Sequence, residues 1–556
     1  MFSKEWIVNN MIKLVGKKAL NKIKASTLDP EKSQNDFLDA LMNENKNTVF
    51  GKDHNFSEIK NYNDYKKNVP IRNYDDFDKY LELLAKGADD VLFPGKPVMY
   101  NTSSGTTGKP KLVPISAKFK KNLSEFNKTW MYSILEQNPG IFKGQSLTSV
   151  GKAIEGYTDD GTPIGSISGN SFRTIPKIIK TTYSSTYPLF AIDDYDLRYY
   201  AIARNALSHN ITVSISPSIA NFIRYHQTIM ENFDKMVDEI RYGKMNEEVL
   251  KQLSAEDRAE VEERITPNPE RADELVALKA KYGEDLLPKH YWTELRVINA
   301  WVQGNFSILM KRLKKYFPAT TVIRAFGYQA SEGRFGISLD NHWDYSLLIP
   351  TEYFYEFIPV ENRDDENPET LQYHELELDK RYYIIISNIS GLYRYDMNDI
   401  LEVVGFYNKT PLLKFIQKGA GIVSLMGEKL SEEQVITSTQ ETASKAGLVV
   451  KNFLMFGDNK KFKYEYFVEF EQTPSDEEKI DFVENFDKKL QELNIEYSSK
   501  RQSKRLNTPE LITLPENSHH KIKQSLVEKG LAKDGQYKDL YLSEKVSTRE
   551  VLSEII

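Results

Sequence analysis

The sequence predicts an α/β protein in two parts, a large N-terminal domain over residues 1–422 and a small α+β domain over residues 423–556. Three observations support this prediction. Strand-like apolar runs and helical patterns follow one another through the longer part. A glycine-rich junction interrupts the pattern near residue 422. Beyond it, a strand pattern and a long helical pattern occupy about 130 residues, an ordinary size for one domain.

The composition is that of a globular protein without bulk positive charge. The 556 residues include 74 Lys and Arg against 80 Asp and Glu, a formal net charge of −6, and 40% of the chain is hydrophobic. We therefore expect no nucleic-acid partner. Cysteine is absent, which excludes a disulfide framework, thiolate catalysis and zinc fingers. The absence of cysteine fits a reducing compartment, so we expect the protein in the cytoplasm. We also expect it to be a monomer.

No stretch approaches the roughly 18 consecutive apolar residues of a membrane-spanning helix, so no integral membrane segment is expected. The N-terminal segment mixes lysines with apolar residues, as targeting peptides do. Its apolar residues recur at helical spacing, however, and form no continuous run. These residues are Trp6, Ile7, Met11, Leu14 and Val15. The spacing favours an ordinary amphipathic helix over a membrane-associated segment.

The first half of the chain is predicted to be mainly helical around one polar loop. A helical pattern covers Asn35–Asn45, and strand-like residues stand on both sides of the loop Thr102–Gly108. A polar, glycine-containing loop between two strands is typical of ligand binding. Residues 190–245 are predicted as helices. Residues 245–289 are predicted as a charged helical insert on the surface, because they contain few apolar residues.

The second half is richer in strands. A helical pattern over residues 301–317 precedes a strand, a turn and a strand over residues 319–339, and two β-rich runs flank a turn over residues 381–406. After the junction a helix is predicted to begin near Ser431, with acidic residues in its first turn. A strand over residues 462–471 and a helix over residues 476–493 follow in the small domain.

The run Ser103–Lys111 has the composition of a polyphosphate-binding loop. It contains four hydroxyl side chains, two glycines and two lysines, and phosphate oxygens bind well to hydroxyls, backbone N–H groups and point charges. The run is not a Walker A loop, because its glycines stand too close together and Pro110 replaces the Ser or Thr that would bind magnesium. Alone, such a run would be interpreted as a flexible surface turn.

Two further runs, Gly327–Glu332 and Gly391–Asp399, follow this loop in order. The three runs together resemble the phosphate loop, the Y-G-x-[ST]-E element and the ribose-binding element of the adenylate-forming, acyl-activating superfamily. Flanking segments such as FGKDHNF, NVPIRNYDDF and ASEGRFGI resemble the GH3 family of acyl-acid amido synthetases, in its bacterial branch, over nearly the whole chain. The resemblance implies a large N-terminal domain of β-sheets flanked by helices, and a smaller mobile C-terminal domain.

This resemblance also implies an activity and a role for each motif residue. ATP and Mg²⁺ would serve to join a carboxylic acid to an amine, usually an amino acid, through an acyl-adenylate. The ATP phosphates would be bound by Ser103, Ser104, Thr106 and Thr107, with Lys111 as the cation of the loop.

In the second run, Gly327 and Tyr328 would belong to the nucleotide site, with the Tyr328 ring stacked on adenine. Ser331 would reach the α-phosphate, and Glu332 would bind Mg²⁺, a cation that prefers oxygen ligands. In the third run, Asp399 would accept hydrogen bonds from both ribose hydroxyls. Interpreted alone, Tyr328 would be a core aromatic residue and Asp399 a turn residue.

Two lysines of the small domain, Lys429 and Lys538, are implied as catalytic cations that approach the nucleotide in different poses of that domain. We expect Lys538 to serve adenylation and Lys429 the second half-reaction. Without the resemblance, either would be interpreted as a solvated surface lysine. The chain departs from the family pattern at Asp396, Asn398, Lys418 and Asp539–Leu540, where a basic residue, a glycine, an arginine and a Pro-Arg pair are usual.

The predicted function is therefore that of an ATP-dependent acid–amino acid ligase whose partners are two small molecules, an acid and an amine. An acyl-CoA ligase shares every nucleotide contact and is the nearest alternative. A non-catalytic relative is the second, and it would be expected to lose Lys111, Glu332 or Asp399, all of which are present. The sequence identifies neither substrate, although helices between residues 120 and 230 are expected to supply the acid pocket.

Overall fold

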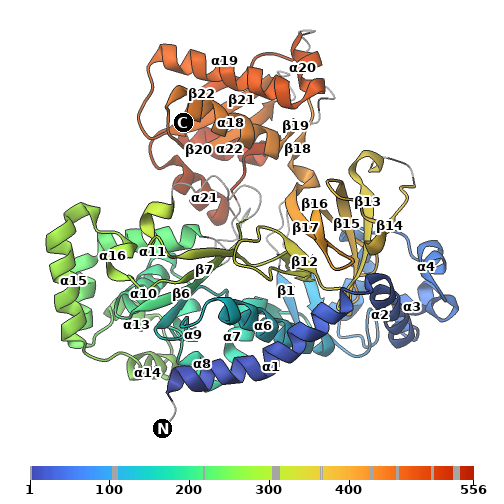
Figure 1. The fold of residues 1–556 in the computed structure, drawn as a ribbon, viewed down its shortest axis with the longest axis horizontal. Coiled ribbons are helices and arrows are strands. Elements are labelled where there is room, and N and C mark those ends of the chain that lie inside the picture. Colours follow the sequence, from blue (N-terminus) through green and yellow to red (C-terminus); the bar gives the residue numbers. More distant parts are fainter. Residues whose placement is uncertain are drawn as a thin grey trace.

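The structure is a computed structural model in which a large N-terminal part carries a smaller C-terminal part (Figure 1). This architecture of mixed helices and strands confirms the predicted fold class. The residues described are 3–102, 111–216, 219–302, 313–363, 365, 367–425, 428, 430–458, 463–502, 506–529 and 539–556.

A parallel sheet lies in the middle of the N-terminal part. Val213 and Val297 pack into the core cluster on one of its faces, whereas Leu147 and Ile298 pack into a second cluster on the other. The sheet is therefore buried on both sides, as parallel sheets usually are. Its strands, in spatial order, are β3 (Gln145–Thr148), β6 (Ile211–Ile215), β7 (Val297–Ala300) and β8 (Val322–Ala325).

Strand β6 shows that the prediction of helices throughout residues 190–245 was wrong. Ile211, Thr212 and Val213 are at most 1% exposed, and β-branched residues of this kind favour strands. A short strand that is buried on both faces has no alternation of apolar and polar residues. The spacing of its apolar residues therefore did not distinguish β6 from the helices on either side.

The N-terminal part also contains a seven-stranded antiparallel sheet and a smaller mixed sheet. The order of the large sheet is β11 (Gly336–Ile337), β12 (Ser346–Leu348), β17 (Thr410–Lys418), β16 (Tyr395–Tyr407), β15 (Arg381–Ser387), β13 (Phe354–Pro359) and β14 (Leu371–Gln372). The order of the smaller sheet is β2 (Leu112–Ile115), β1 (Met99–Thr102), β5 (Pro163–Gly165) and β4 (Gly156–Tyr157). The predicted strands around the polar loop are thus confirmed as the antiparallel pair β1 and β2.

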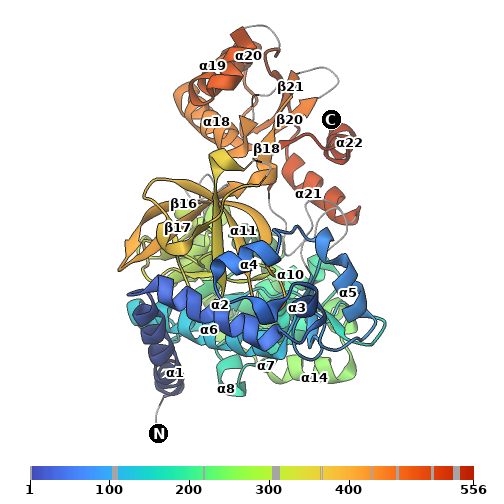
Figure 2. The same ribbon diagram turned by 90° about the vertical axis from the view of Figure 1, so that its right-hand side faces the viewer.

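Helices cover the sheets (Figures 1 and 2). Helices α1 (Lys4–Ser26) and α6 (Ala117–Gln137) share a core cluster with the parallel sheet, and α10 (Tyr195–Leu207) and α11 (Ala220–Glu231) share the cluster on its other face. The other helices of this part are α2 (Pro30–Asn45), α3 (Val49–Asp53), α4 (Tyr62–Asn68), α5 (Asp78–Ala85), α7 (Ile167–Thr174), α8 (Lys177–Lys180), α9 (Tyr187–Phe190), α12 (Phe233–Tyr242), α13 (Glu247–Lys251), α14 (Ala255–Glu263), α15 (Pro269–Tyr282) and α16 (Pro288–Tyr291).

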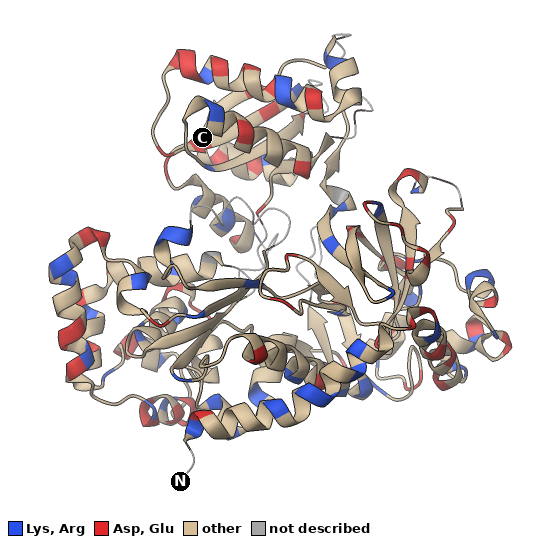
Figure 3. Ribbon diagram, in the orientation of Figure 1, with Lys and Arg blue, Asp and Glu red and all other residues tan. Residues whose placement is uncertain are grey.

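The charged insert predicted over residues 245–289 is helical, as α13, α14 and α15, and carries many acidic and basic residues (Figure 3). It is not a purely solvated surface insert, because Val249, Val261 and Leu275 are buried in a core cluster of the N-terminal part. Most of the helix predicted over residues 301–317 lies outside the described residues, which resume at Leu313. None of the described helices combines the length and the apolar character that a membrane crossing requires.

Helix α1 is present as predicted, but its buried face is not the one that the prediction was based on. Gly16 lies so close to α6 that a Cβ there would stand 2.3 Å from the Cβ of Tyr132. This close approach favours burial of the face of α1 that contains the glycine. The apolar residues of that face are spaced no more regularly than those of the opposite face. The buried residues are Val8, Ile12, Gly16, Leu20 and Ile23, whereas Trp6, Met11, Leu14 and Val15 are exposed.

The C-terminal part is an α+β unit on a four-stranded sheet. A capping box between Ser431 and Gln434 starts its first helix, which confirms the predicted start, and β21 and α19 confirm the other two predicted elements. The strands in spatial order are β22 (Glu510–Thr513), β21 (Lys463–Phe470), β20 (Val450–Asp458) and β23 (Leu542–Ser543). The helices are α18 (Glu432–Ala446), α19 (Asp476–Leu493), α20 (Ile495–Gln502), α21 (Ser518–Glu528) and α22 (Val546–Ile555).

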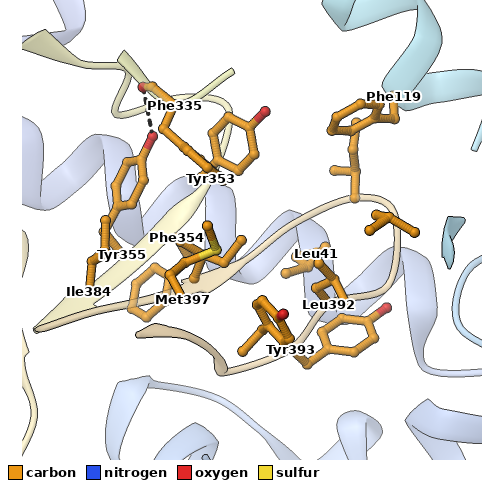
Figure 4. Packing of buried hydrophobic residues seen from close by; sticks show 14 of the residues in the cluster. Leu41, Phe119, Phe335, Tyr353, Phe354, Tyr355, Ile384, Leu392, Tyr393 and Met397 are labelled. Carbon is orange, nitrogen blue, oxygen red and sulfur yellow. Dashed lines mark hydrogen bonds between the residues drawn. The ribbon is translucent and has the colours of Figure 1, made fainter. Parts of the chain in front are cut away.

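The large sheet rests on the N-terminal helices through a core rich in aromatic residues (Figure 4). The Tyr355 hydroxyl donates to the carbonyl of Phe335 at 3.1 Å. The ring of Tyr393 stacks on that of Phe50, with centroids 4.6 Å apart. Stacked pairs of this kind add about 0.5–1.5 kcal/mol to the free energy of unfolding beyond area burial. These contacts hold the start of β16 in place, because the strand begins two residues after Tyr393.

Candidate functional site

The candidate site lies near the end of the N-terminal part that faces the C-terminal part (Figure 1). Three segments meet there, and each carries one of the predicted motifs. The first is represented by Lys111, which directly precedes β2. The second is the turn between the short strands β9 (Gln329–Ala330) and β10 (Gly333–Arg334). The third is the beginning of β16, which pairs with the end of β17.

An irregularity at the start of β16 presents Asp399. The register between β15 and β16 shifts here, so that Ile385 pairs with Asp396 but Tyr383 pairs with Ile400. Such a bulge redirects side chains. Asn398 within it has a φ of 50°, a left-handed conformation that asparagine adopts more readily than most residues. Asparagine can therefore occupy the position at which the family pattern has glycine.

Asp396, another departure from the family pattern, stabilises the same turn. Its Oδ1 accepts a hydrogen bond of 2.7 Å from the Asn398 N–H, and its Oδ2 accepts one from the guanidinium of Arg363. That guanidinium also lies over the ring of Tyr383, 4.5 Å from the centroid. The two departures thus belong to one local arrangement that supports Asp399.

Buried Asp399 forms a cluster with buried Tyr328 and partly exposed Lys418. The Tyr328 hydroxyl donates to Asp399 Oδ2 at 2.5 Å, and Lys418 Nζ lies 2.6 Å from Oδ1. Burial, together with the nearby carboxylate of Asp399, raises the pKa of Tyr328, so the phenol remains a donor. Burial opposes the charge of Lys418, but Asp399 and Glu332 outweigh it and raise the pKa of this lysine.

One oxygen of this cluster is available to a ligand. The Lys418 ammonium approaches Asp399 Oδ1 outside hydrogen-bond geometry, and within the described residues this buried oxygen accepts no hydrogen bond. The oxygen is compensated by the charge of Lys418 but can still accept a hydrogen bond from a ligand hydroxyl, so it fits the ribose contact implied for Asp399.

The Tyr395 hydroxyl connects the other two motifs. It donates to Glu332 Oε1 at 3.3 Å and accepts from Lys111 Nζ at 3.4 Å. Burial, followed by the charge of Glu332, raises the pKa of Tyr395. The structure therefore brings together Lys111 of the first motif, Glu332 of the second and Tyr395 of the third. Lys111 also lies over the ring of Tyr74, 5.2 Å from the centroid.

Two buried amides hold the turn that carries Ser331 and Glu332. The Asn101 side chain donates to the Ser331 carbonyl at 2.9 Å, and the Asn388 side chain donates to the Glu332 carbonyl at 3.2 Å. At the base of the turn Gly327 has a φ of 95°, and a Cβ there would stand 2.4 Å from the Gly336 carbonyl oxygen. No other residue fits that position without strain.

The described part of the site contains Lys111, Gly327, Tyr328, Ser331, Glu332 and Asp399. Sequence reasoning assigned no role to Tyr395, although it belongs to the third motif, nor to Asn101 and Asn388. No local signal identifies those two asparagines, because their partners are distant in the sequence. The remaining predicted residues lie outside the described residues, namely Ser103, Ser104, Thr106, Thr107, Lys429 and Lys538.

Glu332 is suited to hold a magnesium ion together with the phosphates of a nucleotide. In the described chain no group of three or more histidine, aspartate or glutamate side chains could hold a metal by itself. Mg²⁺ commonly binds to one or two carboxylates together with substrate phosphates. Glu332, half-buried beside Lys111 and Tyr395, fits that pattern.

The fold is that of the adenylate-forming enzymes. A crystal structure of 2-hydroxyisobutyryl-CoA ligase matches it with a TM-score of 0.50 and 10% identity, over 97% of this chain and 91% of that one. The structure of GH3.15 acyl acid amido synthetase matches with a TM-score of 0.84 and 18% identity, over 96% of this chain and 95% of that one.

Sequence comparison identifies the family. Residues 19–322 match the GH3 family N-terminal domain, residues 346–418 its central domain and residues 433–546 its C-terminal domain. The chain therefore belongs to the GH3 family.

Similar proteins with curated names are plant enzymes. The probable indole-3-acetic acid-amido synthetase GH3.11 of Oryza sativa subsp. japonica is 25% identical, over 79% of this chain and 77% of that protein. The jasmonoyl-L-amino acid synthetase JAR4 of Nicotiana attenuata is 24% identical, over 79% and 78%. The 4-substituted benzoates-glutamate ligase GH3.12 of Arabidopsis thaliana is 25% identical, over 75% and 74%.

Proposed function

We propose that the protein is an ATP-dependent acyl-acid amido synthetase that joins a carboxylic acid to an amine, most simply an amino acid. The observation that carries this proposal is that residues of three distant motifs lie close together. Lys111 and Glu332 both contact the Tyr395 hydroxyl. Asp399 pairs with Lys418. It is supported by relatives of the same family whose names describe acid–amino acid ligases.

The cluster of Tyr328, Asp399 and Lys418 supports a specific nucleotide pose. Asp399 Oδ1 would accept from the ribose hydroxyls, while Tyr328 holds Oδ2 in place. The Tyr328 ring is 1% exposed, so we propose that it stacks on adenine only after ligand binding uncovers one of its faces. Ser331 would bind the α-phosphate. The phosphates themselves would be bound by Ser103, Ser104, Thr106 and Thr107, beside Lys111.

The proposed chemistry proceeds in two half-reactions. A carboxylate oxygen of the acid attacks the α-phosphorus of ATP, the bond to pyrophosphate breaks, and an acyl-adenylate forms. An amine nitrogen then attacks the acyl carbon, AMP leaves, and the nitrogen loses a proton. A bound Mg²⁺ would offset negative charge on the phosphates. Glu332 would orient that ion, and the positive charges of Lys111 and Lys418 would lower the cost of the charge that develops in the first step.

The C-terminal part is proposed to supply the remaining cations. We propose a boundary at residue 422, with the junction that contains Gly419 and Gly421 as a hinge. Lys538 would then serve adenylation and Lys429 the second half-reaction.

The flanking segments FGKDHNF, NVPIRNYDDF and ASEGRFGI support our further proposal that the chain belongs to a bacterial branch of the family. A chain without cysteine also suits the reducing cytoplasm that we propose as its location.

The first half-reaction tests the proposal. The purified protein is expected to exchange labelled pyrophosphate into ATP only when a suitable member of a carboxylic acid panel is present. The physical reason is that the exchange requires reversible attack of a carboxylate on the α-phosphorus. A protein that binds ATP tightly but exchanges no pyrophosphate with any acid would be a non-catalytic relative.

A further inference from the structure

Helix α1 presents a second apolar stripe to solvent. Its inner stripe packs against α6, but Trp6, Met11, Leu14 and Val15 are 47%, 39%, 81% and 44% exposed. Met11 and Leu14 stand three positions apart, so they share one face of the helix, and Trp6 and Val15 flank them. Single exposed apolar residues are ordinary, but four on one surface helix are a patch that calls for a partner.

Helix α1 is also strongly basic, although the chain as a whole is acidic. Six lysines stand in Lys4–Ser26 against the single acid Glu5, a balance of 6 − 1 = +5, compared with −6 for the whole chain. Blue segments recur along α1 in Figure 3. Within the described residues Lys13, Lys17 and Lys18 have no carboxylate partner, and all three are exposed. Their charges are therefore available to a partner.

Helix α8 extends this surface. Lys177 and Lys180 stand at its two ends, and Ile178 and Ile179 between them pack, partly buried, against the core cluster that α1 shares. The two helices are directly connected, because Lys4 Nζ donates to the Thr181 carbonyl at 2.5 Å. Figure 1 shows both at the edge of the N-terminal part that points away from the C-terminal part. Binding at this edge leaves the candidate site open.

The sequence favoured an ordinary amphipathic helix whose apolar residues are buried, but four of those residues are exposed. We therefore propose that the outer face of α1 binds an anionic membrane surface. The helix would lie parallel to the membrane, with Leu14 and Met11 at the boundary of the acyl chains. Helices that carry apolar residues with tryptophan on one face and lysines beside them bind in this way, and each lysine near an anionic surface adds to the attraction.

The positive charge of α1 argues against the simplest alternative partner of this face, a second copy of the chain. Two copies that joined through this face would bring together two helices of charge +5 at close range, and like charges across an interface are repulsive. An anionic lipid surface instead neutralises them. The inference does not depend on the proposed enzymatic function, since none of these residues belongs to the candidate site.

Vesicle flotation with the full-length protein tests the inference. We expect the protein to float with vesicles of phosphatidylcholine and phosphatidylglycerol, but not with phosphatidylcholine alone. At about 1 M salt, where charges are screened beyond about 3 Å, binding should weaken strongly. Leu14→Glu should weaken binding about ten-fold or more, because it removes an apolar contact and adds a repelled charge.

The matched control is Leu378→Glu, which alters an exposed leucine outside α1 (52% exposed) and should bind like the wild type. Both variants should melt at the wild-type temperature, which shows that they fold. The inference is overturned if the wild-type protein does not float with anionic vesicles, or if Leu14→Glu binds them as tightly as the wild type does. A dimer in solution that Leu14→Glu dissociates would assign the face to a second copy, and capture of an acidic protein without lipid binding would assign it to that partner.

Discussion

Replacing Glu332 with Gln is expected to slow pyrophosphate exchange about 10²–10³-fold, the usual effect of removing one electrostatic contact to developing charge. The amide keeps the shape of the carboxylate but loses its charge, so the phosphates lose the ion that Glu332 is proposed to orient. The hydrogen bond from Tyr395 can persist with the amide oxygen, so the turn should keep its conformation. Initial rates of exchange at several magnesium concentrations measure the effect.

The control for Glu332→Gln is Glu256→Gln, on the exposed surface of α14. It removes the same charge far from the site and should exchange at the wild-type rate. If Glu332→Gln also exchanged at that rate at ordinary magnesium concentrations, Glu332 would not be the magnesium ligand.

Replacing Arg394 with Met should lower the free energy of unfolding by about 3–5 kcal/mol, the usual cost of leaving one member of a buried ion pair unpaired. Arg394 and Glu356 are 2.9 Å apart, and their side chains are 6% and 1% exposed. The guanidinium also donates to the carbonyl of Val69 at 2.8 Å. Although burial opposes the charge, Glu356 raises the pKa of Arg394. Equilibrium unfolding in urea measures the loss.

Arg381→Met is the matched control. Arg381 pairs with Glu402 and Glu433 at 2.7 and 2.9 Å, but its side chain is 44% exposed. Exposed pairs contribute about 0–1 kcal/mol, so this variant should unfold close to the wild-type midpoint. The double variant Arg394→Met with Glu356→Leu should recover part of the loss, because it removes the unpaired charge. Equal losses for Arg394→Met and Arg381→Met would contradict the account.

The motifs predicted which residues of the described site meet, because each motif is a continuous run whose chemistry can be inferred locally. They did not predict how the residues meet. The bond from Tyr328 to Asp399 spans 71 positions, and the bond from Asn101 to Ser331 spans 230. Contacts of this range depend on how the strands pair, which a single sequence does not reveal. Arg363, which supports Asp399 through Asp396, lies outside all three motifs for the same reason.

The fold class was predictable because most elements carry a clear period, as α19 and β21 do. The predictions failed where two alternative structures fit the spacing of the apolar residues about equally well. Helix α1 carries two apolar stripes, and only the close approach of Gly16 to Tyr132 selects the inner one. Strand β6 is short and buried on both faces, so it has no amphipathic pattern to distinguish it from its helical neighbours.

The central claim is that the acyl group passes to an amine. Once pyrophosphate exchange has identified an acid, the most direct test supplies that acid, ATP and magnesium with pooled amino acids and CoA together, and identifies the products by mass spectrometry. The account predicts an amide with an amino acid, formed in equal amount with AMP. A CoA thioester formed without any amide would contradict it and would identify the protein as an acyl-CoA ligase.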